Sequence, residues 1–294
     1  MQKFVGTGVA LITPFKEDLS IDFTALEKLV EYNIANGTNY LVINGTTAES
    51  ATITKQERKQ IIDAIVKTNA GRLPLVLGIG GNNTLAVIDD IKTTDLSNID
   101  GILSVAPYYS KPTQEGFYQH FKAIAQATEK PIILYNVPGR TAKNMDTETT
   151  LKLANDFKNV VGVKEAGNNM QQYLELIRDK PSGFLVISGD DDLALGVTLA
   201  GGSGVISVIG QAYPKEFSTL INCGLQGKNK AGYAIHFKMM QIVDLIFAEN
   251  NPAGVKTVLQ ELDICKNAVR LPLVKASNNL QEQIAAFVKS FKID

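Results

Sequence analysis

Lys164 is the residue of this chain best suited to act as a nucleophile. It ends a run of β-branched residues and glycine from Val160 to Val163, and the segment from Glu165 to Gly167 follows it. An ammonium group at the end of an apolar strand loses hydration, which favours the neutral amine that attacks a carbonyl carbon. This setting predicts Schiff-base chemistry. It is also, and more commonly, the setting of a structural lysine whose head stays in water.

Three more polar clusters follow apolar runs of the sequence. Residues 44–50 (Asn-Gly-Thr-Thr-Ala-Glu-Ser) form the first cluster, Tyr108 and Tyr109 the second, and residues 135–141 the third. They supply hydroxyls and backbone N–H groups for an anion, phenols able to pass protons, and Arg140, whose fork of donors suits a carboxylate. Each cluster alone is typical of a turn or of packed aromatic residues. A shared location would favour a functional site.

The elements that must position these groups are eight apolar runs separated by amphipathic helical stretches. Runs that are apolar on successive residues suit strands covered on both faces, as in a parallel sheet wrapped by helices. The runs span residues 8–13, 40–44, 74–79, 101–106, 131–136, 160–164, 184–188 and 204–208. Eight such units predict an α/β fold, a (β/α)₈ TIM barrel, rather than an open sheet. In such a barrel the carboxyl ends of the strands share one mouth, where all the polar clusters would meet.

After Val208 the strand pattern stops and the sequence predicts helices. Pro214 suits a first helical turn, residues 232–248 form a further helix, and Asn251-Pro252 suits an N-cap followed by the first helical residue. An apolar face closes the chain, formed by Leu280, Ile284, Phe287, Val288 and Phe291. We therefore expect a catalytic barrel over residues 1–225 and a C-terminal helical region over 226–294, with no flexible linker between them.

Composition excludes several classes of protein. The chain has 294 residues, 45% of them hydrophobic, which is enough for one large domain with an appendage. Lys+Arg 29 against Asp+Glu 30 gives a net charge of -1, too little to attract nucleic acid or an anionic membrane. No apolar run reaches the roughly 18 residues of a membrane span. The sequence therefore predicts a soluble, cytoplasmic protein.

Three motifs resemble ligand sites, but each has a simpler interpretation. Asp190-Asp191-Asp192 could bind a metal, yet acidic residues are also favoured where a helix opens. Residues 201–204 (Gly-Gly-Ser-Gly) precede the last apolar run, so they predict a tight turn away from the chemistry. Residues 78–81 (Gly-Ile-Gly-Gly) lack the GxGxxG spacing of a dinucleotide site. Cys223, Cys265 and the two histidines show no zinc-ligand spacing. We predict no metal and no nucleotide cofactor.

Several motifs together resemble the dihydrodipicolinate synthase (4-hydroxy-tetrahydrodipicolinate synthase) family. This family belongs to the pyruvate-dependent class I aldolases related to N-acetylneuraminate lyase. The motifs that carry the resemblance are residues 45–50, the Tyr-Asn-Val-Pro-Gly-Arg segment at 135–140, residues 161–165, residues 188–191 and residues 204–207. They occur in register over nearly the whole chain, which is more specific than any single motif.

The resemblance implies a lyase that condenses pyruvate with L-aspartate 4-semialdehyde to give 4-hydroxy-tetrahydrodipicolinate. This is the first committed step of diaminopimelate and lysine biosynthesis. The catalytic residues it implies are Lys164, which forms the Schiff base, Tyr135, which passes protons, and Thr46 and Tyr109, which form a relay. Tyr109 would reach in from an adjacent subunit of a homotetramer, a dimer of dimers.

The resemblance also implies substrate-binding residues. Thr47 would hold the pyruvate carboxylate, Ile206 would present its backbone to the same ligand, and Gly189 would border it. Arg140 would receive the carboxylate of the semialdehyde. No cofactor is implied, because the substrate itself forms the covalent Schiff base.

Two other functions stay open. A sister aldolase, such as N-acetylneuraminate lyase or 2-keto-3-deoxygluconate aldolase, would use Lys164 and Tyr135 equally well. Arg140 favours the synthase, since those relatives tend to lack an arginine after the Tyr-Asn-x-Pro element. A non-catalytic barrel that binds a keto acid is the other alternative, but it would not need the amine and the phenols together.

A regulatory pocket for lysine is implied in part. Ser50, Asn82 and Tyr108 match the pocket of lysine-inhibited members. The positions that would supply an acidic side chain and histidines are Ala86, Lys55 and Arg58. Without the carboxylate, and with nearby cations, the pocket has no partner for a lysine ammonium, so we expect weak or absent feedback by lysine.

Overall fold

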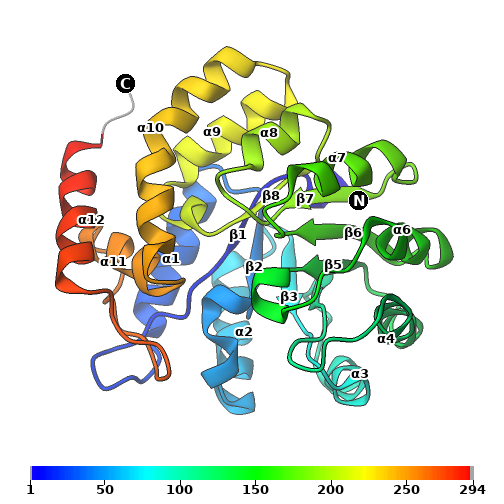
Figure 1. Ribbon diagram of the computed structural model, residues 1–294. Helices are drawn as coiled ribbons and strands as arrows, with labels where there is room; N and C mark the ends of the chain where they lie inside the picture. Colours follow the sequence, from blue (N-terminus) through cyan, green and yellow to red (C-terminus); the bar gives the residue numbers. More distant parts are fainter. Residues whose placement is uncertain (1, 292–294) are drawn as a thin grey trace.

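The computed structural model describes residues 2–291 and contains a closed barrel of eight parallel strands (Figure 1). Each strand pairs with the next along the chain, and β8 pairs with β1 to close the barrel. The strands are β1 (Gly6–Ala10), β2 (Tyr40–Ile43), β3 (Leu75–Gly78), β4 (Gly101–Val105), β5 (Ile132–Asn136), β6 (Val160–Glu165), β7 (Leu185–Ser188) and β8 (Gly204–Ser207). The predicted (β/α)₈ TIM barrel is confirmed.

Helices connect the strands and surround them. Those of the barrel are α1 (Phe23–Ala35), α2 (Lys55–Asn69), α3 (Thr84–Thr93), α4 (Gln114–Gln126), α5 (Pro138–Thr141), α6 (Thr147–Asp156), α7 (Met170–Asp179), α8 (Ala194–Leu199) and α9 (Pro214–Leu225). Short 3-10 turns lie at η1 (Gln2–Phe4), η2 (Thr46–Ala48), η3 (Ser50–Thr52) and η4 (Ile209–Gln211). The capping box between Thr54 and Glu57 opens α2 as its sequence indicates.

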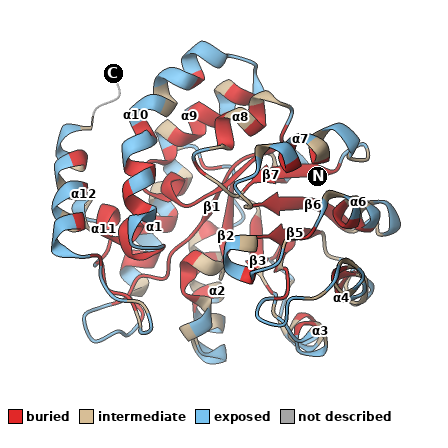
Figure 2. Cartoon of the chain, viewed as in Figure 1, coloured by how far each residue is buried: buried red, intermediate tan, exposed pale blue. Residues whose placement is uncertain are grey.

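The strands are buried on both faces because their alternate residues enter two different cores (Figure 2). Tyr40 and Val42 of β2 pack inside the barrel, whereas Leu41 and Ile43 face the helices. This explains why the strand sequences read as continuous apolar runs rather than alternating ones.

The C-terminal region consists of α10 (Asn229–Ala248), α11 (Ala253–Glu261) and α12 (Asn278–Ser290). Helix α10 packs against α8 and α9 of the barrel, and α12 packs against α10 and α11. In Figure 1 these helices lie beside α1 on one flank of the barrel. In residues 2–291 no helix is both long enough and apolar enough to cross a membrane.

Three predicted boundaries are wrong. Helix α10 begins at Asn229 rather than at residue 232. The first strand covers Gly6–Ala10 instead of residues 8–13. The Leu11 N–H still donates to Val42 O of β2, but the chain then leaves the sheet and the Ile12 N–H donates to Gln211 Oε1. Leu11, Ile12 and Thr13 are buried there without being a strand. Helix α11 begins at Ala253, with Pro252 as its N-cap. The side chain of Asn251 is used elsewhere, as described below.

Candidate active site

Lys164 and Tyr135 lie side by side at the carboxyl ends of two neighbouring strands. They are paired residues of β6 and β5, and Lys164 Nζ lies 4.5 Å from the centroid of the Tyr135 ring. Lys164 is only 5% exposed. Both border a cavity of about 620 Å³, whose walls also include Thr46, Thr47 and Arg140. We call this the barrel-mouth cavity. It brings together the amine, the phenol, the hydroxyls and the guanidinium that the sequence predicts would meet.

A hydrogen-bonded clamp lies behind this pair, on the helix-facing side of the same strands. Asn136 Nδ2 donates to both carboxylate oxygens of Glu165, at 3.1 and 2.9 Å, and Gln172 Nε2 donates to one of them at 2.9 Å. Burial raises the pKa of Glu165 to about 7, although the amide donors oppose this shift. Because Asn136 and Glu165 directly follow Tyr135 and Lys164, the clamp fixes the relative position of the catalytic candidates.

Gly189 borders the barrel-mouth cavity and approaches Lys164 closely. A Cβ atom at this position would lie 2.8 Å from Lys164 Cε and 2.6 Å from Ala166 Cβ, so a side chain would displace the amine. The Gly189 N–H donates to Glu165 O at 2.6 Å. Only glycine allows this passage of the backbone beside the amine.

The three aspartates at 190–192 also border the barrel-mouth cavity, but two of them accept hydrogen bonds from protein donors. Asp190 accepts from the Asn168 N–H at 3.0 Å and from the Tyr173 hydroxyl at 3.1 Å. Asp191 is buried and accepts from the N–H groups of Val208 and Ile209, at 3.1 and 2.9 Å. Burial raises the pKa of Asp191 to about 6. The predicted helix-opening role is wrong, because α8 begins only at Ala194 and Asp191 instead holds the backbone after β8.

Ile206 lies within β8, two residues before Val208. Its side chain is fully buried inside the barrel with Tyr135, and Ile206 is not among the residues that border the barrel-mouth cavity.

Asparagines from the α10–α11 connection reach the cavity from the C-terminal region. Asn251 Nδ2 donates to Thr47 Oγ1 at 2.9 Å, and Arg140 Nη2 donates to Asn250 Oδ1 at 3.2 Å. Lys256 pairs with Glu49, two residues beyond Thr47. The sequence does not indicate these residues as part of the site, since their partners lie in distant parts of the chain and no motif marks them.

Tyr109 is not brought to Lys164 within this chain. It has a positive φ of 70° and is 90% exposed, so its phenol lies on the surface. Tyr108 is 44% exposed and borders a second pocket.

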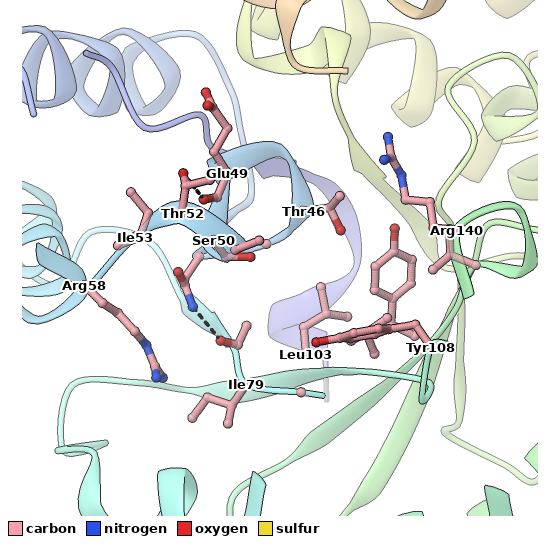
Figure 3. A pocket seen from close by; sticks show the side chains of 18 of the residues that line it. Thr46, Glu49, Ser50, Thr52, Ile53, Arg58, Ile79, Leu103, Tyr108 and Arg140 are labelled. Carbon is pink, nitrogen blue, oxygen red and sulfur yellow. Dashed lines mark hydrogen bonds between the residues drawn. The ribbon is translucent and has the colours of Figure 1, made fainter. Parts of the chain in front are cut away.

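This second pocket, which we call the side pocket, adjoins the barrel-mouth cavity. It measures about 540 Å³ and shares Thr46, Tyr135 and Arg140 with that cavity. Ser50, Lys55, Arg58 and Tyr108 also border it. Figure 3 shows Arg58 far from Arg140, across the pocket.

The polar groups around the side pocket are partly engaged with one another. Asn82 Nδ2 donates to Tyr108 O at 3.2 Å, and Arg58 Nη1 lies 2.6 Å from Asp90. Arg58 Nε and Nη2 are buried and find no partner within residues 2–291. Ala86 lies on an exposed face of α3 and carries no charge. The side pocket therefore offers cations, and both acidic residues that border it are already paired, Asp90 with Arg58 and Glu49 with Lys256.

Fold and site define a (β/α)₈-barrel enzyme with a buried amine at its mouth. Comparison with known proteins makes the assignment specific. The model of the dihydrodipicolinate synthetase family matches residues 3–291. The 4-hydroxy-tetrahydrodipicolinate synthase of Flavobacterium psychrophilum is 56% identical over 289 residues, which cover 98% of this chain and 99% of that protein. The chain belongs to the dihydrodipicolinate synthetase family.

Solved structures of the same family are similar to this chain over nearly its whole length. The dihydrodipicolinate synthase of Aquifex aeolicus has a TM-score of 0.93 at 39% identity and covers 97% of each chain. The chloride-inhibited enzyme of Acinetobacter baumannii, solved with pyruvate, has a TM-score of 0.94 at 37% identity, covering 97% of this chain and 98% of that one. These names support the synthase and give no support to the sister aldolases.

Proposed function

We propose that the chain condenses pyruvate with L-aspartate 4-semialdehyde to form 4-hydroxy-tetrahydrodipicolinate and water. The observation that carries this proposal is the buried Lys164 amine, 4.5 Å from the Tyr135 ring inside a cavity that Arg140 also borders. This reaction would be the first committed step in the biosynthesis of diaminopimelate and lysine.

Lys164 attacks the keto carbon of pyruvate, and loss of water leaves a protonated imine. The imine withdraws electrons from the methyl carbon, which loses a proton and becomes an enamine nucleophile. The enamine attacks the aldehyde carbon of the second substrate and forms a carbon–carbon bond. The substrate's amine then displaces Lys164 as the ring closes, which frees the enzyme.

Tyr135 carries the protons in these steps. A phenol holds its proton at neutral pH, so it needs a hydrogen-bonded chain that shares the proton with the reacting atoms. Thr46 borders the same cavity as Tyr135 and would continue the chain. Tyr109 of a neighbouring subunit would complete it.

Two subsites bind the carboxylates of the substrates. Thr47 would bind the carboxylate of pyruvate, Ile206 would present its main chain to the same ligand, and Gly189 would border it. Arg140 would bind the carboxylate of the semialdehyde through paired N–H donors. The family relative from Acinetobacter baumannii, crystallised with pyruvate, supports an oxo-acid ligand for this fold.

The proposal needs no cofactor, because the protonated imine is itself the electron sink. Both substrates are charged metabolites, so we place the reaction in the cytoplasm. We propose a homotetramer, a dimer of dimers, because the exposed Tyr109 can serve a proton relay only if another subunit receives it.

The test is reduction with borohydride in the presence of pyruvate, followed by peptide mass spectrometry. We expect a stable adduct on Lys164, and none in Lys164→Ala, which should also lose turnover in a coupled assay with both substrates. An unmodified Lys164 in the folded wild-type protein would contradict the proposal. A parallel assay with N-acetylneuraminate separates the synthase from a sister aldolase.

A further inference from the structure

Two side chains of the C-terminal region reach the turn that follows β2. Asn251 donates to Thr47 Oγ1 at 2.9 Å, and Lys256 Nζ pairs with Glu49 Oε1 at 2.5 Å. Their positions lie 204 and 207 residues further along the chain than those of their partners. Figure 3 shows the Glu49 carboxylate directed away from the side pocket. The turn that carries Thr46 and Thr47 is therefore fastened to the C-terminal region at two points.

The direction of the bond between Asn251 and Thr47 decides what the hydroxyl can do. A threonine hydroxyl has one hydrogen to donate. Because the Asn251 amide donates to Thr47, that hydrogen is not used by the amide and can be donated to a ligand. Thr13 and Thr52 differ, since their hydroxyls donate to the carbonyl oxygens of Ala48 and Glu49.

The surroundings favour this arrangement. Thr47 and Asn251 both border the barrel-mouth cavity, and both are buried, so bulk water competes little for the hydroxyl. The ion pair between Glu49 and Lys256 is fully buried, and Glu49 also accepts from the Arg270 N–H at 2.8 Å. These contacts restrict the position of the turn. The Asn251 amide donor and the Thr47 hydroxyl oxygen therefore stay within hydrogen-bonding distance.

We propose that Asn251 is a positioning residue that directs the Thr47 hydroxyl hydrogen toward the carboxylate of the oxo-acid substrate. The inference rests on the proposed function, which supplies a carboxylate at this place. It assigns to the C-terminal region a part in binding the first substrate that no motif of the sequence indicates.

The test compares Asn251→Asp in two backgrounds, with Thr47 and with Thr47→Val. A carboxylate at 251 would accept the Thr47 hydrogen and remove it from the ligand. With Thr47 present, we expect the KM for pyruvate to rise roughly tenfold or more, because a hydrogen bond to a charged group is lost. The kcat and the KM for the semialdehyde should change far less. In the Thr47→Val background the same substitution should raise the KM for pyruvate by a clearly smaller factor. Asn279→Asp, on the exposed part of α12, is the matched control.

Two results would overturn the inference. An unchanged KM for pyruvate would mean that the amide accepts from Thr47, and an equal rise in both backgrounds would mean that charge alone acts. If thermal melting shows that Asn251→Asp is not folded, Asn251→Leu replaces it. Its rise in the KM for pyruvate should again be larger with Thr47 than with Thr47→Val. Wild-type protein that forms the pyruvate adduct while Asn251→Asp binds pyruvate normally would refute this inference and leave the proposed function intact.

Discussion

Arg140 stands at the rim of the barrel-mouth cavity, on the short helix α5 that follows Tyr135. Its guanidinium donates to Asn250 Oδ1 at 3.2 Å, and the rest of its fork is available to a ligand carboxylate. We predict that Arg140→Ala raises the KM for aspartate semialdehyde roughly 10- to 100-fold, because a charge-assisted pair is lost. The KM for pyruvate should change little. Steady-state kinetics with each substrate varied in turn measure both values.

Arg140→Lys is the conservative control for this prediction. It keeps the charge but loses the bidentate fork, so its KM for the semialdehyde should fall between those of the wild type and of Arg140→Ala. An equal loss of affinity for both substrates in Arg140→Ala would contradict a role confined to the second carboxylate.

The sequence could predict Lys164, Tyr135 and Arg140 as partners because each follows an apolar run, and the carboxyl ends of barrel strands meet at one mouth. It could not predict Asn251 or Lys256 as neighbours of the same site. Their partners are about 200 residues away, and no periodicity connects a helix start with a turn after β2. Tertiary packing alone brings them together.

At the scale of elements, the buried ion pair between Lys256 and Glu49 joins α11 to the turn after β2. Both side chains are fully buried, Lys256 Nζ also donates to Ala268 O at 2.8 Å, and burial lowers the pKa of Lys256. We predict that Lys256→Met destabilises the protein by about 3–5 kcal/mol, because it leaves an unpaired carboxylate in the interior. The free energy of unfolding from urea titration measures this loss.

A double variant separates the charge from the packing. In Glu49→Gln/Lys256→Met no buried charge is left unpaired, so we expect it to be more stable than Lys256→Met alone. Lys266→Met, at an exposed position, is the matched control. A double variant less stable than either single variant would show that the pair acts through shape rather than charge.

The clamp between β5 and β6 makes stability depend on pH. Burial raises the pKa of Glu165 from 4.5 to about 7, so the folded state holds the carboxyl proton more tightly than the unfolded chain does. The stabilising contribution of Glu165 is therefore complete below pH 4.5 and is lost as the pH rises to about 7. We predict that the advantage of wild type over Glu165→Gln in free energy of unfolding is about 2 kcal/mol greater at pH 5 than at pH 8.

Urea titrations at the two pH values measure this difference, with Glu129→Gln at an exposed position as the control. A constant difference between wild type and Glu165→Gln would mean that Glu165 does not titrate in this range.

Element boundaries were predictable only where side chains mark them. The capping box fixes the start of α2 because both of its hydrogen bonds are local. The first strand was misplaced because Leu11 and Ile12 are as apolar as a strand, whereas they are buried under other parts of the fold. An apolar run indicates that its residues are buried, but it does not show whether they pair with a neighbouring strand.

At the scale of the whole molecule, the side pocket bears on regulation. Lys55 and Arg58 border it. Its two carboxylates are already paired, Asp90 with Arg58 and Glu49 with Lys256, so a lysine ammonium would meet cations without a free carboxylate. We predict weak feedback, with half-inhibition requiring L-lysine above about 1 mM, in assays at half-saturating pyruvate. Strong inhibition at micromolar lysine would refute this prediction. Ala86→Glu, which adds a carboxylate at the matching position, should strengthen inhibition.

Tyr109 connects the proposed site with the proposed homotetramer. Its phenol is 90% exposed and lies outside both pockets of its own chain, so its place in the proton relay requires a second subunit. Lys164→Ala and Tyr109→Ala should each be nearly inactive alone, the first without the nucleophile and the second without the relay. A mixed dimer, however, contains one site with an intact Lys164 that receives an intact Tyr109 from its partner.

We therefore predict that refolding the two inactive variants together restores activity in the coupled assay. With equal amounts and random pairing, mixed dimers form half of the population and each has one complete site, so the recovered activity should approach about a quarter of the wild-type value. Refolding each variant with itself is the control. A mixture no more active than its separate components would show that Tyr109 acts within its own chain or not at all, and it would remove the physical reason for requiring an oligomer.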